Sequence, residues 1–448
     1  MWQKILEFFT KKKKKKKKKL VSVSASALEE NSSIMLIQTP VQNLMIGMYV
    51  AELDIPWLES PFMFQGFLVE TEKELEKLRK TCQYVYVDSS KQKKRKINTN
   101  TKIKSNQLGG QALIFGKPPK RLGTFEKEIL RAELNYKDTG ILVCGFMDKI
   151  VSDGSIDAKL AKEAVSTCVN SILHSPDAFL WLSQLKHKDQ YTAQHSLNVC
   201  VLSIVLGRHI GLNELHLNQV GLCGMMHDMG KMLVPLEVLN KPAILEEDEL
   251  EIMRSHTTLG YELLKSSDDM FYGAVETALT HHEHLDGKGY PRKINSNNMS
   301  YYSNIVAIAD MYDAITSDRV YRKGRTHHVA TKAMLDVSGS HLDAELVVKF
   351  IESLGVYPPG CFVELNNGSV AIVVEQNSRF KLRPKVMMIL DEDKNSIEGS
   401  VIDISEMVFD KSGSVLSIKA IINPDDYQID SEKYYQQGVI QKGFSKNN

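Results

Sequence analysis

Histidine and aspartate are the residues of this sequence whose types and spacing could perform chemistry. Burying an imidazole or a carboxylate beside apolar residues costs roughly several kcal/mol for each unpaired charge unless something compensates it. Divalent cations can supply that compensation, and mixed imidazole and carboxylate ligands suit iron, manganese, zinc or nickel better than magnesium or calcium alone. Seven such side chains lie beside or within one long stretch of helical period: His195, His227, Asp228, His256, His281, His282 and Asp310.

A short segment rich in glycine and proline follows the second histidine pair. Two glycines and a proline favour a tight turn that lets backbone approach a ligand closely. Tyr290 in this segment offers an aromatic face or a hydroxyl to a purine base. An ordinary loop is the competing interpretation, but its position beside His281 and His282 favours a pocket wall. We predict substrate contacts in this segment at Asp286, Gly289, Tyr290 and Pro291.

Basic residues near the histidines and aspartates could bind phosphate. Lys231 comes three residues after Asp228, on the same face if the helix continues, where it could neutralise phosphate charge. Its competing role is that of an ordinary surface lysine at a helix end. Arg319 and Arg322 suit phosphate oxygens and guanine edges, although they could equally pair with Asp313 or Asp318. We place Asp313, Arg319 and Arg322 among the expected substrate contacts.

The pattern of elements predicts a mainly α fold. From Phe125 to about Leu354 apolar residues recur three and four positions apart, which favours a helical bundle with one shared core. Within it we expect a single helix over 246–264. After residue 360 the period falls to two around Asn367-Gly368, which predicts a small C-terminal β subdomain. Short β-like runs and one helix at 70–81 predict a small α+β domain before the bundle.

Composition sets the remaining boundaries. The chain has 448 residues, which is too long for one hydrophobic core, and its six cysteines are scattered, as suits a reducing compartment. Nine consecutive lysines, Lys11–Lys19, predict a disordered arm that could also touch an anionic membrane surface. We expect four parts: a polybasic arm at 1–35, an α+β domain at 36–165 with a basic linker near 91–120, a catalytic domain at 166–360, and a β subdomain with a tail at 361–448.

The motifs identify a family resemblance. His227-Asp228 with the downstream Asp310 resembles the HD superfamily of metal-dependent phosphohydrolases, and the eleven residues from His281 to Pro291 match the HHExxDGxGYP signature of its HD-GYP subgroup. The resemblance covers roughly residues 175–360. The region around Met48 to Asp88 is similar to a domain of unknown function often found before HD-GYP domains, for which a regulatory or dimerising role is the default.

The resemblance implies two metal ions, with iron or manganese expected first and nickel or zinc also compatible. One metal would be held by His195, His227, Asp228 and Asp310, and the other by Asp228, His256, His281 and His282. Some relatives carry a glutamate four residues before the first histidine that is associated with a third metal, and Tyr191 stands there in this chain. Asp228 would bridge both metals. Glu283 could orient a metal-bound histidine.

The activity implied by the resemblance is hydrolysis of cyclic di-GMP to linear pGpG, with a metal-bridging hydroxide attacking the phosphodiester. Whether a second hydrolysis yields GMP stays open. Asp228 and Lys231 are the expected catalytic residues. Two alternatives stay open: hydrolysis of 3'3'-cyclic GMP-AMP, and a non-catalytic receptor for a cyclic dinucleotide that acts through protein partners.

The resemblance also bears on partners and location. Two kinds of protein partner are compatible with it: diguanylate cyclase domain proteins, bound through the GYP loop (Asp286–Pro291), and a second copy of this chain in a homodimer. We expect no DNA or RNA partner. The expected location is the cytoplasm, with peripheral contact at the inner membrane if the lysine arm binds lipid.

Overall fold

A computed structural model describes most of the chain. The described residues are 35–44, 46, 48–55, 67–69, 71–88, 112–114, 122–184, 191–296, 299–318, 323–397 and 399–429. The predicted polybasic arm lies outside these residues except for Met35, which begins a strand. Most of the predicted basic linker, Arg319 and Arg322 also lie outside them. The expectations for them are therefore not addressed by the structure.

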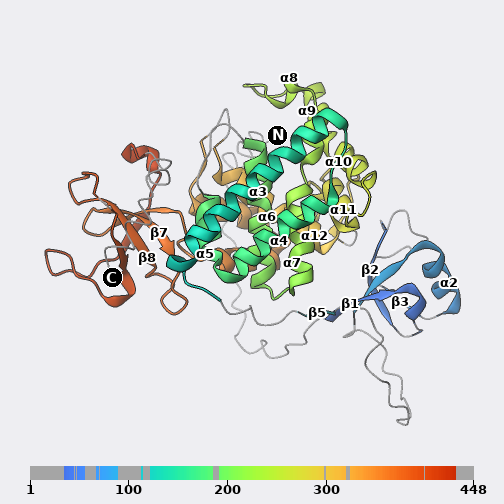
Figure 1. The fold of residues 1–448 in the computed structure, drawn as a ribbon, viewed down its shortest axis with the longest axis horizontal. Coiled ribbons are helices and arrows are strands. Elements are labelled where there is room, and N and C mark those ends of the chain that lie inside the picture. The colour runs from blue at the N-terminus through green and yellow to red at the C-terminus, as the bar shows by residue number, and fades with distance from the viewer. Residues whose placement is uncertain are drawn as a thin grey trace, which may run out of the picture. The chain divides into compact units, whose positions relative to one another are not determined.

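Helices dominate the middle of the chain, and several gather into one bundle (Figure 1). The last seven residues of the central helix α7, Val220 to Met226, are all buried, so its end lies inside the protein. The helices and 3₁₀ turns of this region are α3 (Phe125–Asp153), α4 (Ala158–His174), α5 (Pro176–Ser183), α6 (Tyr191–His209), α7 (Glu214–Met226), η4 (Met229–Leu233), α8 (Leu236–Leu239), α9 (Glu247–Arg254), α10 (His256–Lys265), α11 (Tyr272–Thr280), α12 (Tyr301–Thr316), α13 (His327–Val337) and α14 (Ala344–Leu354).

Side-chain caps fix where several of these helices begin. Asn213 accepts a hydrogen bond from the backbone N–H of His216 at the start of α7. Ser300 does the same for Ser303 at the start of α12. Because each cap satisfies a backbone donor that the helix itself leaves unpaired, the helix starts at a defined residue. The register of the side chains that follow is therefore defined as well.

The single helix predicted over 246–264 is wrong, because α9 and α10 are separated at Ser255. The apolar period continues across this point, so periodicity alone could not reveal the interruption. The Ser255 hydroxyl donates to the Ile252 carbonyl oxygen at 2.6 Å, a local bond that competes with regular helix hydrogen bonding. The interruption places His256 at the first position of a new helix.

The region before the bundle contains a small antiparallel sheet in the order β3-β2-β4-β1-β5. Helix α2 (Glu72–Thr81) begins with a capping box formed by Thr71 and Glu74, and it buries Leu75 and Leu78 in the core of this region. Strand β5 comes from within the segment predicted as a linker. The strands are β1 (Met35–Pro40), β2 (Tyr49–Leu53), β3 (Phe67–Leu68), β4 (Tyr84–Asp88) and β5 (Ala112–Ile114).

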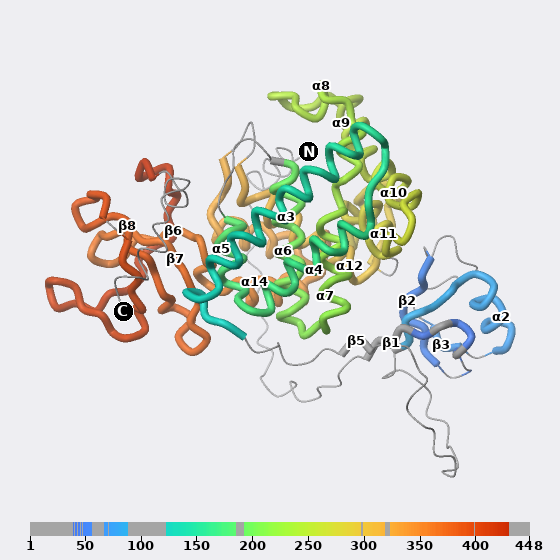
Figure 2. Tube along the Cα trace, in the orientation of Figure 1, coloured from blue at the N-terminus to red at the C-terminus, as the bar shows by residue number. Residues whose placement is uncertain are grey.

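A second five-stranded antiparallel sheet follows the bundle in the order β10-β6-β7-β8-β9. The β6–β7 turn contains Gly368 at a φ of +91°, a conformation that favours glycine. This region lies at the red end of the chain (Figure 2). Its strands are β6 (Phe362–Leu365), β7 (Val370–Glu375), β8 (Lys385–Leu390), β9 (Val401–Asp403) and β10 (Ile418–Ile421).

The predicted fold class, a mainly α bundle between a small α+β region and a small β region, is confirmed. Among the described residues, no helix combines the length and the apolar character needed to cross a bilayer.

Candidate metal centre

The ends of helices bring most of the predicted ligands together. His227 caps the end of α7 and Asp228 opens η4 directly after it. His281 caps α11, and His256 begins α10. Side chains at such positions lie beside an apolar core without interrupting a helix. His195 on α6 and Asp310 on α12 approach from two further helices.

Asp228 lies at the middle of the centre. Its Oδ2 is 3.3 Å from the Nε2 of His195 and 3.3 Å from the Nε2 of His227. One of the two groups in the described chain that could hold a metal ion consists of His195, His227 and Asp228, with ligand atoms within 4.8 Å of one another. Asp310 adjoins this group, because its Oδ1 is 3.2 Å from the Nε2 of His195.

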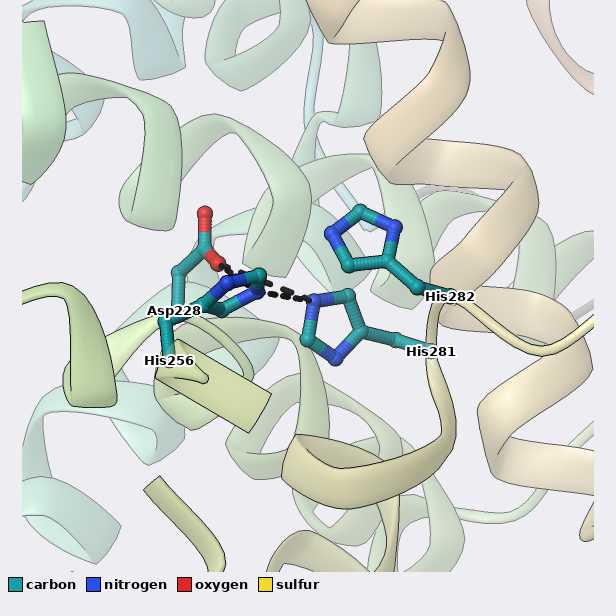
Figure 3. Close-up of side chains that lie close together, drawn as sticks. All are labelled: Asp228, His256, His281 and His282. Atoms are coloured by element: carbon teal, nitrogen blue, oxygen red, sulfur yellow. Dashed lines mark hydrogen bonds and ion pairs between the residues drawn. The ribbon is translucent and has the colours of Figure 1, made fainter. Parts of the chain in front are cut away.

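The other oxygen of Asp228 faces the second group. Its Oδ1 is 3.4 Å from the Nε2 of His256 and 3.6 Å from the Nε2 of His281. With His282, these residues form a second set of ligand atoms within 4.8 Å of one another. Figure 3 shows the four side chains converging. The structure therefore brings together all seven predicted ligands, with Asp228 shared between two sets.

Hydrogen bonds fix which nitrogen of each imidazole is available. The Nδ1 of His227 lies 2.7 Å from the Gly224 carbonyl oxygen, and the Nδ1 of His256 lies 2.6 Å from the Met253 carbonyl oxygen. A carbonyl oxygen can only accept, so each Nδ1 carries the proton and each Nε2 keeps its lone pair. His281 follows the same pattern, with its Nδ1 3.0 Å from the Ala278 carbonyl oxygen. Metal-binding histidines almost always donate their other ring N–H to an acceptor in this way.

Electrostatics make the centre attractive to cations. Burial disfavours the charged form of Asp228, yet Lys231 and His227 hold the pKa of its carboxyl well below the usual range. Burial also disfavours charge on Asp310, and His195 lowers the pKa of that carboxyl well below its usual range. Burial lowers the pKa of His256 to about 3, so this imidazole is neutral and able to bind a metal. The centre thus combines ionised carboxylates with a neutral His256, whereas Asp228, Asp310 and Asp313 raise the pKa of His195 well above its usual value against the effect of burial.

Two buried atoms show that the residues fit a metal. The Nε2 of His227 and the Oδ1 of Asp228 are buried and lack a hydrogen-bond partner. Leaving such an acceptor unsatisfied costs about 1–3 kcal/mol, or more where it is charged. Each of these atoms belongs to one of the two ligand sets, and a divalent cation would satisfy it. The donor set matches the preference of iron, manganese, zinc and nickel.

A close backbone contact sets the distance between the two ligand sets. A Cβ built on Gly230 would collide with the carbonyl oxygen of His256 and with the backbone nitrogen of Gly260. Only glycine therefore allows η4 to pack this tightly against α10. Because Asp228 lies in the turn before Gly230, this contact places its carboxylate beside the imidazole of His256.

The GYP loop is tied to the histidine pair by its backbone. A Cβ on Gly289 would collide with the backbone of Glu283 and His284, and the Tyr290 N–H donates to the His282 carbonyl oxygen at 3.2 Å. Glu283 is buried, and its carboxylate accepts hydrogen bonds from the backbone of Arg292 at 2.7 Å and Ile294 at 3.2 Å. Glu283 therefore anchors the loop through these hydrogen bonds, which differ from the predicted role of orienting a metal-bound histidine.

Tyr290 lies against a candidate ligand. Its ring stacks on the His282 imidazole with the centroids 4.8 Å apart, and the Arg254 guanidinium lies over the ring at 5.5 Å. Asp286 bonds within the loop, where its Oδ1 accepts from the Lys288 N–H at 3.0 Å. Pro291 follows Tyr290 directly. Of the loop residues predicted to bind substrate, Gly289 and Tyr290 therefore adjoin His282 of the second ligand set.

Two further predicted residues lie against the ligands. Lys231 pairs with Asp228 through Oδ2, on the same side as Asp228, as its spacing of three residues predicts. Asp313 is 3% exposed, and its carboxylate bonds to His195 and Asn198. This placement favours support of a ligand over the substrate contact that we predicted. The sequence analysis did not predict a role for Asn198. A signal was present, because Asn198 follows His195 by three residues, a spacing that places both on one face of a helix. Asp313 follows Asp310 at the same spacing.

Comparisons with known proteins agree with this centre. A family model described as "HD domain" matches residues 181–346, a "domain of unknown function (DUF3391)" matches residues 36–161, and a "KOW domain associated with HD domain" matches residues 362–428. The chain is 33% identical over 373 residues to cyclic di-GMP phosphodiesterase PA4108 of Pseudomonas aeruginosa, covering 83% of this chain and 89% of that protein.

Two further relatives match parts of the chain. Cyclic di-GMP phosphodiesterase PdeB of Borreliella burgdorferi is 29% identical, with 56% of this chain and 65% of that protein covered. The 3'3'-cGAMP-specific phosphodiesterase 1 of Vibrio cholerae is 35% identical, with 38% of this chain and 39% of that protein covered.

The helical bundle and its buried cluster of histidines and aspartates define a metal-dependent phosphohydrolase of the HD type, an enzyme that hydrolyses phosphodiester bonds. The signature from His281 to Pro291 and the match to PA4108 narrow this class. The chain belongs to the HD-GYP family.

Proposed function

We propose that this chain hydrolyses cyclic di-GMP to linear pGpG, with a second hydrolysis to GMP left open. The single observation that supports this proposal best is the position of Asp228, which turns one oxygen toward each of two histidine sets. A pair of divalent cations, when bound, would supply an activated water and would stabilise the charge of the reacting phosphate. We propose two ions, with iron or manganese expected first.

The ligands would divide between the two ions. His195, His227, Asp228 and Asp310 would hold one, and Asp228, His256, His281 and His282 would hold the other. The shared carboxylate is the residue that keeps the two positions close together, which an in-line displacement at phosphorus requires. The proposed domain division keeps the sequence-based boundaries, with the catalytic domain at 166–360.

Residues around the centre would hold the substrate. Lys231 carries a positive charge at the edge of the ligand sets, and we propose that it neutralises a phosphate oxygen when substrate is bound. Tyr290 would bound the pocket, with Asp286, Gly289 and Pro291 shaping the loop around it. Arg319 and Arg322 keep their proposed roles in binding phosphate or guanine.

The relatives support a cyclic dinucleotide but differ in which one. Several are named cyclic di-GMP phosphodiesterases, whereas others are named as specific for 3'3'-cGAMP. We propose cyclic di-GMP because PA4108 matches far more of this chain than the cGAMP-specific relatives do. From the sequence we also propose a cytoplasmic location and a homodimer. We further propose contact with diguanylate cyclase domain proteins and contact of Lys11–Lys19 with a membrane.

The decisive experiment combines metal analysis with a product assay. The full chain is purified without oxygen, its metal content is measured, and cyclic di-GMP and 3'3'-cyclic GMP-AMP are each incubated with it. We expect two metals per chain and faster formation of pGpG than of the product from the mixed dinucleotide. Preference for the mixed dinucleotide would replace the substrate assignment. Binding without cleavage in metal-loaded protein would support the receptor instead.

A further inference from the structure

A chain of buried hydrogen bonds leads from the ligand His195 to a helix outside the ligand sets. The His195 Nδ1 lies 2.7 Å from Oδ2 of Asp313, and the Asn198 amide donates to Oδ1 of Asp313 at 2.9 Å. The Tyr136 hydroxyl donates to Oδ1 of Asn198 at 3.0 Å. Gln194 donates to the same Asn198 oxygen at 3.0 Å and also contacts the Tyr136 hydroxyl. All five residues therefore belong to one network.

The donors and acceptors of these bonds determine how the Asn198 amide and the His195 ring are oriented. Because Asn198 Oδ1 accepts from Tyr136 and Gln194, its amide nitrogen must face Asp313. Asp313 therefore receives the amide on Oδ1 and keeps Oδ2 for the Nδ1–H of His195. That bond turns the Nε2 of His195 toward Asp228 and Asp310, where it would offer its lone pair to a bound metal. The Tyr136 hydroxyl is thus one of two donors that hold the amide in this orientation.

Burial makes the network hard to replace with water. Tyr136, Asn198 and Asp313 are 5%, 4% and 3% exposed. The Tyr136 ring packs edge-on against Phe179 with the centroids 5.5 Å apart, so an apolar contact holds the ring while its hydroxyl reaches Asn198. A buried amide that loses a partner is costly, and it regains one by rotating or shifting.

Tyr136 comes from a part of the chain that the HD domain match does not include. It lies on α3, which packs against α4, α5 and α6 and is seen along the bundle in Figure 1. Residues 36–161, which include all of α3, match the domain of unknown function, whereas the HD domain match begins at residue 181.

We propose that Tyr136 is a positioning residue for the metal ligand His195, acting through Asn198 and Asp313. Helix α3, which lies inside the DUF3391-matched segment, therefore supplies a part of the support of the metal centre. This inference rests on the metal centre of the proposed function, but not on its substrate. Any displacement of α3 from α6 would disturb the Tyr136–Asn198 bond before it disturbs a ligand.

The test compares Tyr136→Phe with Tyr302→Phe. Tyr302 is a matched control because it is equally buried and its hydroxyl bonds to His216 and Gln219, away from the ligands. Mn²⁺ binding to the metal-free full chain is measured by calorimetry, and thermal unfolding is measured without metal. Removing a supporting partner of a ligand costs about 10–100-fold in affinity, and Tyr136 lies two residues further out, so we expect about 3–10-fold weakening of one binding step. Tyr302→Phe should leave both steps unchanged.

Asp313→Asn provides the second half of the test. If Tyr136 acts through Asp313, Tyr136→Phe should weaken Mn²⁺ binding much less in the Asp313→Asn background than in the unaltered chain. Additive losses would overturn the proposed route. Lower stability with unchanged Mn²⁺ affinity in Tyr136→Phe would reduce Tyr136 to a structural residue and overturn the proposal.

The two proposals can fail separately because no nucleotide is used in this experiment. A chain that binds Mn²⁺ as expected but does not cleave cyclic di-GMP would contradict the proposed substrate alone. A cleaving enzyme whose Mn²⁺ affinity ignores Tyr136→Phe would contradict this inference alone.

Discussion

Asp228 differs from the six other candidate ligands because each of its oxygens faces a different set of histidines. A substitution there should disturb both metal positions, whereas a substitution of one histidine disturbs one. The orphaned Nε2 of His227 belongs to one set only, although its imidazole stands between His195 and His281. Substitutions of Asp228 and His227 should therefore differ in how many metal positions they disturb.

We predict that Asp228→Ala and His227→Ala abolish turnover while keeping the helix content. Metal-assisted stabilisation contributes several kcal/mol, so losing it should slow hydrolysis by about 10³-fold or more. Turnover of cyclic di-GMP and circular dichroism are measured with excess Mn²⁺. Asp228→Ala should lose both bound metals, and His227→Ala should lose at least one. Near-normal activity of either variant with metal in excess would show that the centre is misassigned.

Tyr290 allows a separation of binding from chemistry. We predict that Tyr290→Ala raises KM by about ten-fold, the upper range for one aromatic contact, and lowers kcat less. Tyr290→Phe keeps the ring that stacks on His282 and serves as the matched control. Steady-state kinetics on cyclic di-GMP give both constants. A fall in kcat with an unchanged KM would contradict a role at the pocket wall.

At the scale of elements, the ligand sets depend on how closely η4 packs on α10. We predict that Gly230→Ala destabilises the protein by about 1–3 kcal/mol, since the added methyl group cannot fit against the backbone of His256 and Gly260. The shift should also weaken metal binding, because it moves Asp228 away from His256. Urea unfolding and Mn²⁺ titration measure the two effects.

Gly145 provides the control for that substitution. It lies exposed within α3, and a Cβ there would meet nothing within 4 Å. Gly145→Ala should be neutral or stabilising by up to about 1 kcal/mol, because alanine favours a helix. If Gly230→Ala behaved like Gly145→Ala, the close contact would not set the geometry of the centre.

The sequence predicted the ligands and most helices because both depend on local patterns. The HHExxDGxGYP signature contains its residues within eleven positions, and helical period marks α12 almost to its ends. The break at Ser255 could not be predicted because the apolar period continues across it. The role of Tyr136 could not be predicted because its partner Asn198 is 62 residues away in the sequence. Their contact depends on how α3 packs on α6. No local pattern encodes such a contact.

At the scale of the whole molecule, support for the metal centre reaches beyond the segment that carries the ligands. Every ligand lies between residues 195 and 310, inside the HD domain match, whereas α3 lies outside it. The chain matches PA4108 along most of both proteins, so the association of these segments is shared with that relative. Experiments on the metal centre should therefore use the full chain.

Stability should also depend on pH through a histidine remote from the ligand sets. Burial lowers the pKa of His327 from 6.5 to about 4, even though its Nε2–H donates to the Gly355 carbonyl oxygen at 3.1 Å. Its Nδ1 lies 2.9 Å from the Tyr312 hydroxyl, which can donate to a neutral ring. Between those pH values the unfolded chain holds a proton that the folded chain does not. The stability that His327 contributes is therefore complete above about pH 6.5 and is lost as the pH falls toward 4.

We predict that His327→Gln removes this part of the pH dependence. The shift corresponds to at most about 3 kcal/mol, so the free energy of unfolding of the unaltered chain should fall by up to that much more than that of the variant between pH 7 and pH 4. His328→Gln, at the exposed neighbour on α13, is the control and should follow the unaltered chain. Urea unfolding with a chelator present keeps metal binding out of the comparison. Parallel curves for the unaltered chain and His327→Gln would mean that His327 can be protonated without cost in the folded protein, against the burial and hydrogen bonding that surround it.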